Sequence, residues 1–315
     1  MEKVIMGNTG VEVTRLCFGT LTMSPLQAGI PVEEGTPLIR AALEHGVRFI
    51  DTAQSYRSYP YIAPALRGYG EEVVIVSKSG KAGYDEMKDA VEECRRALDR
   101  DVIQFFLLHN CNSEAELERR RPALEYLLEA KSRGIIRAAG ISTHTAHMVE
   151  VALDRPELEI VMPIINQKNI GVLDGDRYDM LDLVRRAHAA GKGVYAMKPL
   201  AGGHLYDNAE EPLRWVIERP EVHSIALGMR RLAELEYNLA VFEGRPLTAE
   251  LRAAVKQHCK QIFVSAFCEG CGRCVKACAN EAMAIVGGKA QCDHGKCILC
   301  GYCRAACPKF AIRLL

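Results

Sequence analysis

The sequence predicts an α/β protein in which a (β/α)8 barrel is followed by a small α+β domain. Eight short apolar segments alternate with eight amphipathic helical segments over roughly the first 250 residues. The apolar segments have no polar face, which is typical of parallel strands buried under helices. Two cysteine runs of equal spacing then lie near the C-terminus. A doubly wound open sheet is the alternative for the first part.

The predicted elements follow one another at short intervals. The strands span residues 15–20, 48–53, 73–78, 102–109, 136–142, 160–166, 193–199 and 224–229. Ahead of them, residues 4–13 alternate apolar and polar positions around a turn at 8–10, which predicts a hairpin. Asp85, Ser113 and Thr248 are the expected helix caps. We place the barrel in residues 1–260 and the second domain in residues 261–315, with a short linker around 262–267.

Composition excludes several classes of function. The 315 residues are 49% hydrophobic and 25% charged, which suits a globular chain with one large core and a smaller unit. Forty Lys and Arg balance forty Asp and Glu, so we expect no nucleic-acid-binding face and no polybasic membrane anchor. Neither a signal-peptide pattern nor an apolar run of transmembrane length occurs. We therefore expect a cytoplasmic protein, in a compartment that keeps its thirteen cysteines reduced.

The two cysteine runs, CEGCGRCVKAC and CILCGYCRAAC, share the spacing C-x2-C-x2-C-x3-C. Short CxxC loops place thiolates around an iron-sulfur cluster, so two copies predict two clusters. Zinc is the alternative, because CxxC pairs also build zinc ribbons. Four zinc ligands would leave the triple-cysteine spacing and the final Cys307-Pro308 unexplained.

This stretch closely resembles the two-[4Fe-4S] ferredoxins of the bacterial type. The resemblance implies that the fourth cysteine of each run serves the other cluster. The implied ligand sets are Cys268, Cys271, Cys274 and Cys307 for one cluster, and Cys297, Cys300, Cys303 and Cys278 for the other. Ala279 stands where that pattern usually has proline, which removes no ligand.

Ionisable residues end three of the predicted strands, where a barrel of this kind forms its active site. Asp51 ends the second strand and is followed by Tyr56, Lys78 ends the third, and His109 ends the fourth. An ammonium beside a tyrosine lowers its pKa from about 10, and a carboxylate keeps that ammonium charged. We expect Tyr56 to protonate a developing alkoxide in this way.

The segments DTAQSY, IVSK and LLH, in this order at strand ends, resemble the catalytic tetrad of the aldo-keto reductases. The N-terminal hairpin resembles the barrel plug of the same family, and the likeness covers about residues 1–258. It implies an oxidoreductase that interconverts a carbonyl and an alcohol. Tyr56 would be the general acid, Lys78 would tune it, Asp51 would pair with Lys78, and His109 would orient the carbonyl oxygen.

The same resemblance implies a nicotinamide cofactor, NADP(H) or NAD(H). Ser142, Asn166 and Gln167 resemble the positions that hold the carboxamide, and Gly228, Arg230, Arg231 and Asn238 resemble the phosphate and adenosine loop. A helix N-terminus there suits a phosphate, and the two arginines would favour the 2'-phosphate of NADP. Lys198, also assigned to this site, departs from the family's small polar residue, and Met197, Thr143, Glu234 and Tyr237 are further departures. The nucleotide site therefore departs from the pattern more than the catalytic corner does.

Several other side chains near the expected mouth are further candidates for the site. Tyr59 and Tyr61 could take the role of Tyr56, and His204 could line the substrate pocket. We interpret His144 and His147 as surface residues rather than metal ligands.

Two hypotheses about function follow. The first is an aldo-keto-reductase-type enzyme acting on a small carbonyl or alcohol, coupled to or docked through its two [4Fe-4S] clusters, with a ferredoxin or other redox partner. A hydride carries two electrons whereas each cluster passes one; a flavin would reconcile the two and stays open, although the sequence has no flavin motif. The second is a ferredoxin-type electron-transfer or partner-binding protein whose barrel no longer binds nicotinamide. A third hypothesis is that the clusters only stabilise the fold of the C-terminal segment.

Overall fold

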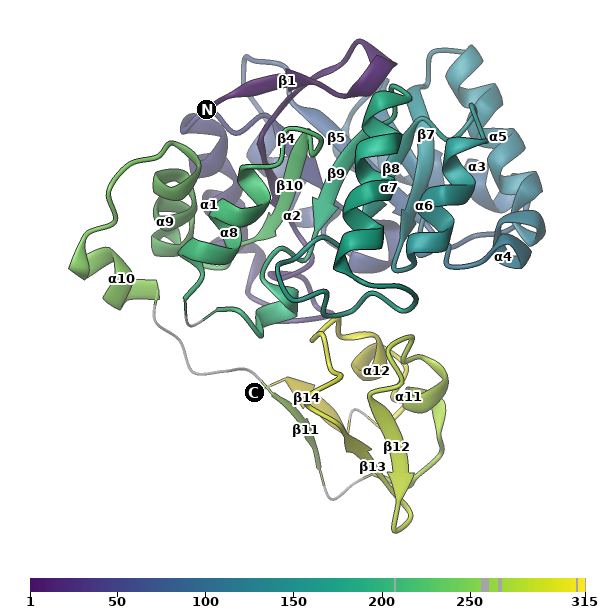
Figure 1. The fold of residues 1–315 in the computed structure, drawn as a ribbon, viewed down its shortest axis with the longest axis vertical. Coiled ribbons are helices and arrows are strands. Elements are labelled where there is room, and N and C mark those ends of the chain that lie inside the picture. Colours follow the sequence, from purple (N-terminus) through teal and green to yellow (C-terminus); the bar gives the residue numbers. More distant parts are fainter. Residues whose placement is uncertain (207, 256–260, 266–267, 310, 315) are drawn as a thin grey trace.

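A computed structural model describes residues 1–206, 208–255, 261–265, 268–309 and 311–314. It confirms the (β/α)8 barrel (Figure 1). The barrel strands are β3 (Leu16–Gly19), β4 (Phe49–Asp51), β5 (Val74–Ser79), β6 (Ile103–Leu108), β7 (Ile136–Thr143), β8 (Ile160–Pro163), β9 (Gly193–Met197) and β10 (Ser224–Gly228). They pair in parallel and in chain order, and β10 closes the ring against β3.

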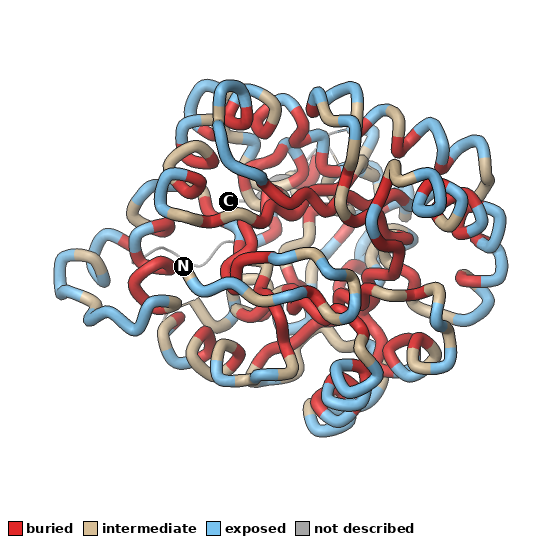
Figure 2. The backbone as a smooth tube through the Cα atoms, turned by 90° about the horizontal axis from the view of Figure 1, so that it is seen from above, coloured by how far each residue is buried: buried red, intermediate tan, exposed pale blue. Residues whose placement is uncertain are grey.

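Helices surround the barrel, as the alternating pattern predicted. They are α1 (Val32–Glu44), α2 (Tyr59–Leu66), α3 (Tyr84–Leu98), α4 (Glu114–Arg119), α5 (Arg121–Ser132), α6 (Ala146–Leu153), α7 (Arg177–Ala189), α8 (Glu210–Ile217), α9 (Leu232–Phe242) and α10 (Ala249–Val255). Buried residues concentrate inside this ring of helices, and exposed residues lie outside it (Figure 2). Helix α3 illustrates why one face of each helix is buried. Its buried residues recur at helical spacing and so form one apolar face: Met87, Ala90, Val91, Cys94 and Leu98.

The predicted caps have mixed outcomes. Ser113 caps α4 by accepting a bond from the Glu116 N–H at 3.2 Å, and Thr248 does the same for Leu251 N–H at 3.2 Å. The prediction for Asp85 was wrong. Helix α3 begins earlier, after Gly83, whose N–H donates to the Glu86 carboxylate at 3.2 Å, so Asp85 lies inside the first turn.

The N-terminal hairpin closes the end of the barrel that lies opposite the C-terminal domain (Figure 1). Strands β1 (Lys3–Ile5) and β2 (Glu12–Thr14) pair antiparallel, and Met6 and Val13 join the apolar barrel interior with Phe49 and Phe105. The Asn8 N–H donates to the Gly191 carbonyl, 2.8 Å away, just before β9 starts. The hairpin therefore fills the end at which the strands begin and leaves the opposite mouth for chemistry.

The C-terminal domain is a small α+β unit. Strand β11 (Ile262–Val264) pairs with β14 (Ile312–Leu314), and β12 (Met283–Val286) pairs with β13 (Lys289–Cys292), both antiparallel. Short helices α11 (Arg273–Lys276) and α12 (Tyr302–Ala305) each start inside a cysteine run. The expected linker around 262–267 is therefore wrong for 262–264, because Ile262 is buried in the core of this unit; residues 266–267 lie outside the described residues.

This domain is seated on the C-terminal mouth of the barrel (Figure 1). Gln27 Nε2 donates to the Leu299 carbonyl at 2.8 Å, and Arg304 Nη1 donates to the Gln27 carbonyl at 2.5 Å. Gly202 has a φ of +68°, and a Cβ at this position would lie 2.1 Å from the Ile298 carbonyl oxygen. Two backbones approach here so closely that the contact requires a glycine.

None of the helices in the described part of the chain is both long enough and apolar enough to cross a membrane.

Candidate active site at the barrel mouth

Asp51, Tyr56, Lys78 and His109 come together at the mouth. Asp51 ends β4 and Lys78 lies in the neighbouring strand β5, so both side chains reach the same opening. Lys78 Nζ lies 2.5 Å from Asp51 Oδ2 and 2.7 Å from the Thr52 carbonyl oxygen. Both partners are almost fully buried. A buried ion pair with good hydrogen bonds fixes the position of its charges.

Tyr56 lies directly beside this pair. It ends the short helix η2 (Gln54–Tyr56), after which Arg57 turns the chain with a φ of +57°. Lys78 Nζ is 5.2 Å from the centre of the Tyr56 ring. The His109 ring meets the Tyr56 ring edge-on, with centroids 5.5 Å apart. The arrangement therefore places a phenol, an ammonium and an imidazole around one opening.

Burial dominates the electrostatics of this corner. It raises the pKa of Tyr56 well above 10, and nearby Tyr302, Asp51 and Cys300 add to the increase. The sequence led us to expect that Lys78 lowers this pKa, whereas the direction in the structure is upward and burial is its largest cause. Burial and the charge of Lys78 also lower the pKa of His109 well below 6.5, so its imidazole is neutral. Burial raises the pKa of the Asp51 carboxyl, while Lys78 opposes that change.

A second tyrosine reaches the site from the C-terminal domain. The Tyr302 hydroxyl lies 3.2 Å from His109 Nε2, and the two rings are 6.4 Å apart. The Tyr302 ring packs beside Tyr56 and Leu26. The two domains pack closely here, because a Cβ on Gly301 would lie 2.3 Å from the Leu26 carbonyl oxygen. The mouth is therefore built from both domains.

The other two tyrosines of this region are bound elsewhere. The Tyr59 hydroxyl bonds to Ser77 Oγ at 2.9 Å, and the Tyr61 hydroxyl donates to the Ile30 carbonyl at 2.7 Å. Neither competes with Tyr56 in this arrangement.

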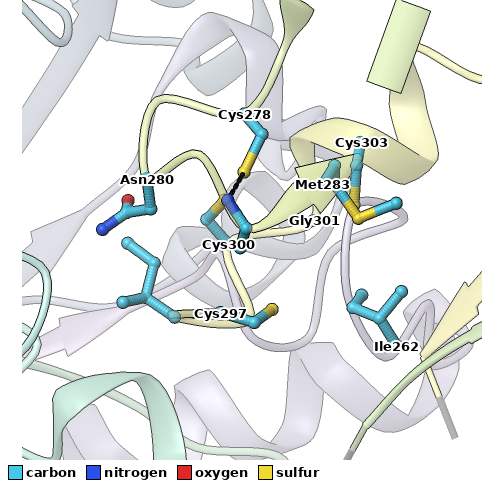
Figure 3. A pocket seen from close by; sticks show the side chains of 10 residues that line it. Ile262, Cys278, Asn280, Met283, Cys297, Cys300, Gly301 and Cys303 are labelled. Atoms are coloured by element: carbon cyan, nitrogen blue, oxygen red, sulfur yellow. Dashed lines mark hydrogen bonds between the residues drawn. The ribbon is translucent and has the colours of Figure 1, made fainter. Parts of the chain in front are cut away.

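Four cysteines of the C-terminal domain line one cavity (Figure 3). They are Cys278, Cys297, Cys300 and Cys303, together with Ile262, Asn280, Ala282, Met283, Ile298 and Gly301. These four are the set that the ferredoxin resemblance assigns to one cluster. The Ala282 N–H donates to Cys278 Sγ at 3.2 Å, a bond that stabilises a thiolate ligand. The donor set and its apolar surroundings fit an iron-sulfur cluster.

The remaining cysteine set includes one exposed thiol. Cys268, Cys274 and Cys307 belong to the same small core, and Cys271 is exposed. Backbone N–H groups donate to Cys268 Sγ at 3.2 Å and to Cys307 Sγ at 3.3 Å. Within the described residues, no three His, Cys, Asp or Glu side chains are spaced to hold a single metal ion.

Lys198 lies between the two domains at the mouth. It follows β9 with a φ of +56°, and its Nζ is 2.9 Å from His144 Nε2. Burial lowers its pKa to about 8, whereas the nearby Cys300 thiol acts in the opposite direction. The interpretation of His144 as a surface residue was wrong: it is buried beneath Lys198. His147 is exposed and pairs with Glu114 at 2.9 Å.

The residues expected to hold a nicotinamide carboxamide are engaged within the protein. The Ser142 hydroxyl accepts the Asn110 N–H at 2.8 Å. Asn166 closes its own loop through three bonds to residues 168 and 170. Gln167 turns outward and donates to Glu211 at 2.9 Å. Above these strand ends, Ile298 contacts the loops after β8 and β9 at Gly171 and Gly202. The cysteine loop thus contacts the loops that follow β8 and β9.

The expected phosphate end is also engaged. The Arg230 N–H donates to Glu234 Oε2 at 2.8 Å, and the guanidinium groups of Arg230 and Arg231 lie 3.3 and 3.4 Å from Glu234 Oε1. Gly228 abuts Thr22, whose Oγ1 would lie 1.4 Å from a Cβ there, and Asn238 is buried in α9. An internal carboxylate therefore occupies the helix N-terminus that a phosphate would use.

His204, which the sequence suggested as a pocket residue, contacts the C-terminal domain. Its Nε2 bonds to the Cys297 carbonyl, so it serves the contact between the domains.

Comparison with known proteins agrees with this geometry. The profile of the Aldo/keto reductase family matches residues 15–212. The chain belongs to the aldo/keto reductase family. The profile of the 4Fe-4S dicluster domain matches residues 260–308. This aldo/keto reductase therefore carries an iron-sulfur domain at its C-terminal end.

Relatives of this aldo/keto reductase cover between 56% and 83% of its chain. An uncharacterized oxidoreductase of Bacillus subtilis is 21% identical over 307 residues, covering 83% of this chain and 97% of its own. A glyoxal reductase of the same species is 30% identical over 182 residues, covering 56% and 61%. A solved structure designated an aldo-keto reductase from Pseudomonas aeruginosa has a TM-score of 0.66 at 27% identity, covering 77% of this chain and 95% of that one.

Sequence reasoning missed two residues of this site. Tyr302 lies inside a cysteine run, and nothing in that run indicates that it faces the barrel. The Tyr195 hydroxyl donates to Asp51 Oδ2 at 3.2 Å from the opposite side of the barrel. Its signal was available, because it is a polar aromatic within an otherwise apolar predicted strand.

Proposed function

We propose that the protein interconverts a small-molecule carbonyl and its alcohol at the barrel mouth, with Tyr56 as the proton donor. The observation that supports this most is the position of Lys78, whose ammonium bonds to Asp51 at 2.5 Å and lies 5.2 Å from the Tyr56 ring centre. A fixed cation beside a phenol stabilises the phenolate that forms when the proton leaves.

The raised pKa of Tyr56 keeps its proton on the phenol at neutral pH. Tyr56 is therefore a general acid in the direction of carbonyl reduction. Neutral His109 orients the carbonyl oxygen through Nε2, the ring atom that faces Tyr302. Asp51 holds Lys78 in place, and the Tyr195 hydroxyl in turn donates a hydrogen bond to Asp51.

Two redox groups are candidates for this reaction. When bound, a nicotinamide nucleotide would supply a hydride, and two [4Fe-4S] clusters would supply single electrons. The chain offers four thiols around a common cavity next to the mouth for a cluster. For a nucleotide it offers a nicotinamide end covered by Ile298 and a phosphate end already paired with Glu234. The residues fit the cluster and do not fit the nucleotide.

We therefore favour the iron-sulfur domain as the redox partner of the site. Reduction of a carbonyl consumes two electrons and two protons: the clusters would pass the electrons one at a time, Tyr56 would protonate the oxygen, and water would supply the proton that the carbon gains. The use of NADP(H) or NAD(H) stays the alternative. It would require the loop 297–302 to leave the mouth and Glu234 to release Arg230.

Anaerobic assays test the proposed reaction. The iron-sulfur-loaded protein is incubated with a panel of aldehydes and ketones, with reduced methyl viologen or NADPH as parallel donors, and alcohols are identified by mass spectrometry. We expect alcohol formation with the viologen, and a loss of about 10²–10⁴-fold in the Tyr56→Phe protein. Electron paramagnetic resonance of the reduced clusters controls for their integrity. Full activity of Tyr56→Phe would refute the role of Tyr56.

A second candidate function is electron transfer without carbonyl chemistry. It is favoured by the contact of Tyr302 with His109, because the hydroxyl occupies a position where a carbonyl oxygen would bind. Clusters that exchange electrons with a carrier, combined with no turnover of any carbonyl by either donor, would establish this candidate instead.

A further inference from the structure

The far side of the iron-sulfur domain carries an exposed corner around the second cysteine set. We define this outer corner as residues 268–276 and 285–289. Its two segments pack closely, because a Cβ on Gly270 would lie 2.3 Å from the Gly288 carbonyl oxygen. The Ala290 N–H donates to Cys268 Sγ at 3.2 Å, which ties the hairpin to the cysteine loop. The β12–β13 hairpin points away from the barrel (Figure 1).

Apolar side chains are exposed at this corner. Ile285 is 39% exposed and Val286 is 50% exposed, and Cys271 in the neighbouring cysteine loop is exposed as well. Together with Phe263 at 49%, they are three of the seven exposed large hydrophobic residues found among those that the structure describes. The smaller domain thus presents a disproportionate share of the exposed apolar surface, which is a mark of an interaction site.

The charge of this domain differs from that of the barrel. The whole chain is balanced, with forty basic and forty acidic residues. Residues 261–315 contain more basic than acidic side chains: Arg273, Lys276, Lys289, Lys296, Arg304, Lys309 and Arg313 against Glu269, Glu281 and Asp293. At the outer corner Arg273, Lys276 and Lys289 are exposed, and the one carboxylate, Glu269, pairs with Lys309 at 3.0 Å. The corner is therefore a small apolar patch with a positive rim.

We propose that the outer corner docks a small acidic one-electron carrier protein. The proposal rests on the proposed function to the extent that the domain must be redox-active. A small apolar centre with a charged rim suits a transient complex, in which charge complementarity steers the encounter. In this transfer one electron leaves the reduced carrier and enters the domain, and no atom changes place. The carrier docks on the far side, so the inner cysteine set stays free to face the barrel.

Binding to a named probe tests the proposal. The probe is an acidic bacterial two-[4Fe-4S] ferredoxin, titrated into the anaerobic holoprotein by calorimetry at low and at high salt. We expect binding that weakens as salt rises. In the charge-reversal variant R273E/K276E the dissociation constant should increase by about tenfold or more. The matched control K88E/R96E reverses two exposed charges on barrel helix α3 and should bind as the wild type does.

A second pair of variants tests the apolar centre. Ile285→Ser and Val286→Ser should also weaken binding, while cluster content and the resonance of the reduced clusters stay unchanged. Equal affinity in wild type and R273E/K276E, binding that ignores salt, or no binding at low salt would each overturn the proposal. The readout contains no carbonyl substrate, so it succeeds or fails separately from the chemistry at Tyr56.

Discussion

The hydroxyl of Tyr302 lies 3.2 Å from Nε2 of His109, although the two residues are 193 positions apart and belong to different domains. His109 is neutral because burial lowers its pKa, so it can share one hydrogen bond with a phenol. The same nitrogen is proposed to orient the substrate oxygen. A substrate that reaches Tyr56 must therefore displace the Tyr302 hydroxyl.

The variant Tyr302→Phe tests this displacement. It removes the competing hydroxyl but retains the ring that packs beside Tyr56 and Leu26. Since a hydrogen bond of this kind contributes about 0.5–1.5 kcal/mol, we expect KM to fall by roughly two- to tenfold with kcat nearly unchanged. Steady-state kinetics with the carbonyl found in the panel measures both. A fall in kcat at constant KM would instead show that the hydroxyl takes part in the chemistry.

The pair of Asp51 and Lys78 is expected to be strongly coupled. Lys78→Met leaves the Asp51 carboxylate buried without its cation, which should destabilise the barrel by about 3–5 kcal/mol. The double variant Asp51→Asn with Lys78→Met removes both charges and should recover a large part of that loss. Denaturant unfolding followed by the fluorescence of the single tryptophan, Trp215, measures each step. Additive losses in the cycle would contradict the coupling.

Two glycines with the same backbone conformation test the seat of the iron-sulfur domain. Gly202 has a φ of +68° and lies against the Ile298 carbonyl, whereas Gly244 has a φ of +67° and a Cβ there would meet no neighbour within 4 Å. Both alanine variants cost about 1 kcal/mol in backbone strain. Gly202→Ala should in addition displace the domain, increasing hydrogen exchange of residues 297–302. Unchanged exchange in Gly202→Ala, relative to Gly244→Ala, would contradict the close seat.

His223 is expected to make the barrel sensitive to acid. Burial lowers its pKa to about 4, and its Nδ1 accepts the Val194 N–H at 3.1 Å. The unfolded chain, with a histidine pKa near 6.5, therefore binds the proton more readily than the folded one. Its stabilising contribution is complete above pH ~6.5 and is lost as the pH falls towards ~4.

His223→Gln keeps an acceptor without a titrating ring, and it should flatten the dependence of unfolding free energy on pH over this range. The difference from wild type should reach on the order of 2–3 kcal/mol between the two ends. Urea unfolding at a series of pH values measures it. Parallel pH profiles for the two proteins would rule out this role for His223.

The sequence was sufficient for the barrel and for the residues that meet at its mouth, because strand ends bring Asp51, Lys78 and His109 to one opening in any barrel of this kind. The cysteine spacing likewise predicted an iron-sulfur domain, and the four cysteines that the ferredoxin resemblance groups together line one cavity. The contact of Tyr302 with His109 could not be predicted, because it depends on how one domain packs on another. Neither could the rise in the pKa of Tyr56, which results from water excluded by that packing.

At the expected nucleotide site, too, the sequence predicted the residue types but not their contacts. The sequence indicated that Glu234 departs from the family pattern, but only the structure places its carboxylate against Arg230 and Arg231. The sequence shows that Glu234 is a carboxylate, whereas the partners of this carboxylate depend on the conformation of the turn that precedes α9.

Titration of the anaerobic holoprotein with NADPH, followed by nicotinamide fluorescence, tests most directly whether the iron-sulfur domain has taken the place of the nucleotide. With Ile298 over the nicotinamide end and Glu234 at the phosphate end, we expect no saturable binding below about 1 mM, the upper end of ordinary KM values. Saturable binding in the micromolar range, with the domain still seated on the mouth, would contradict it.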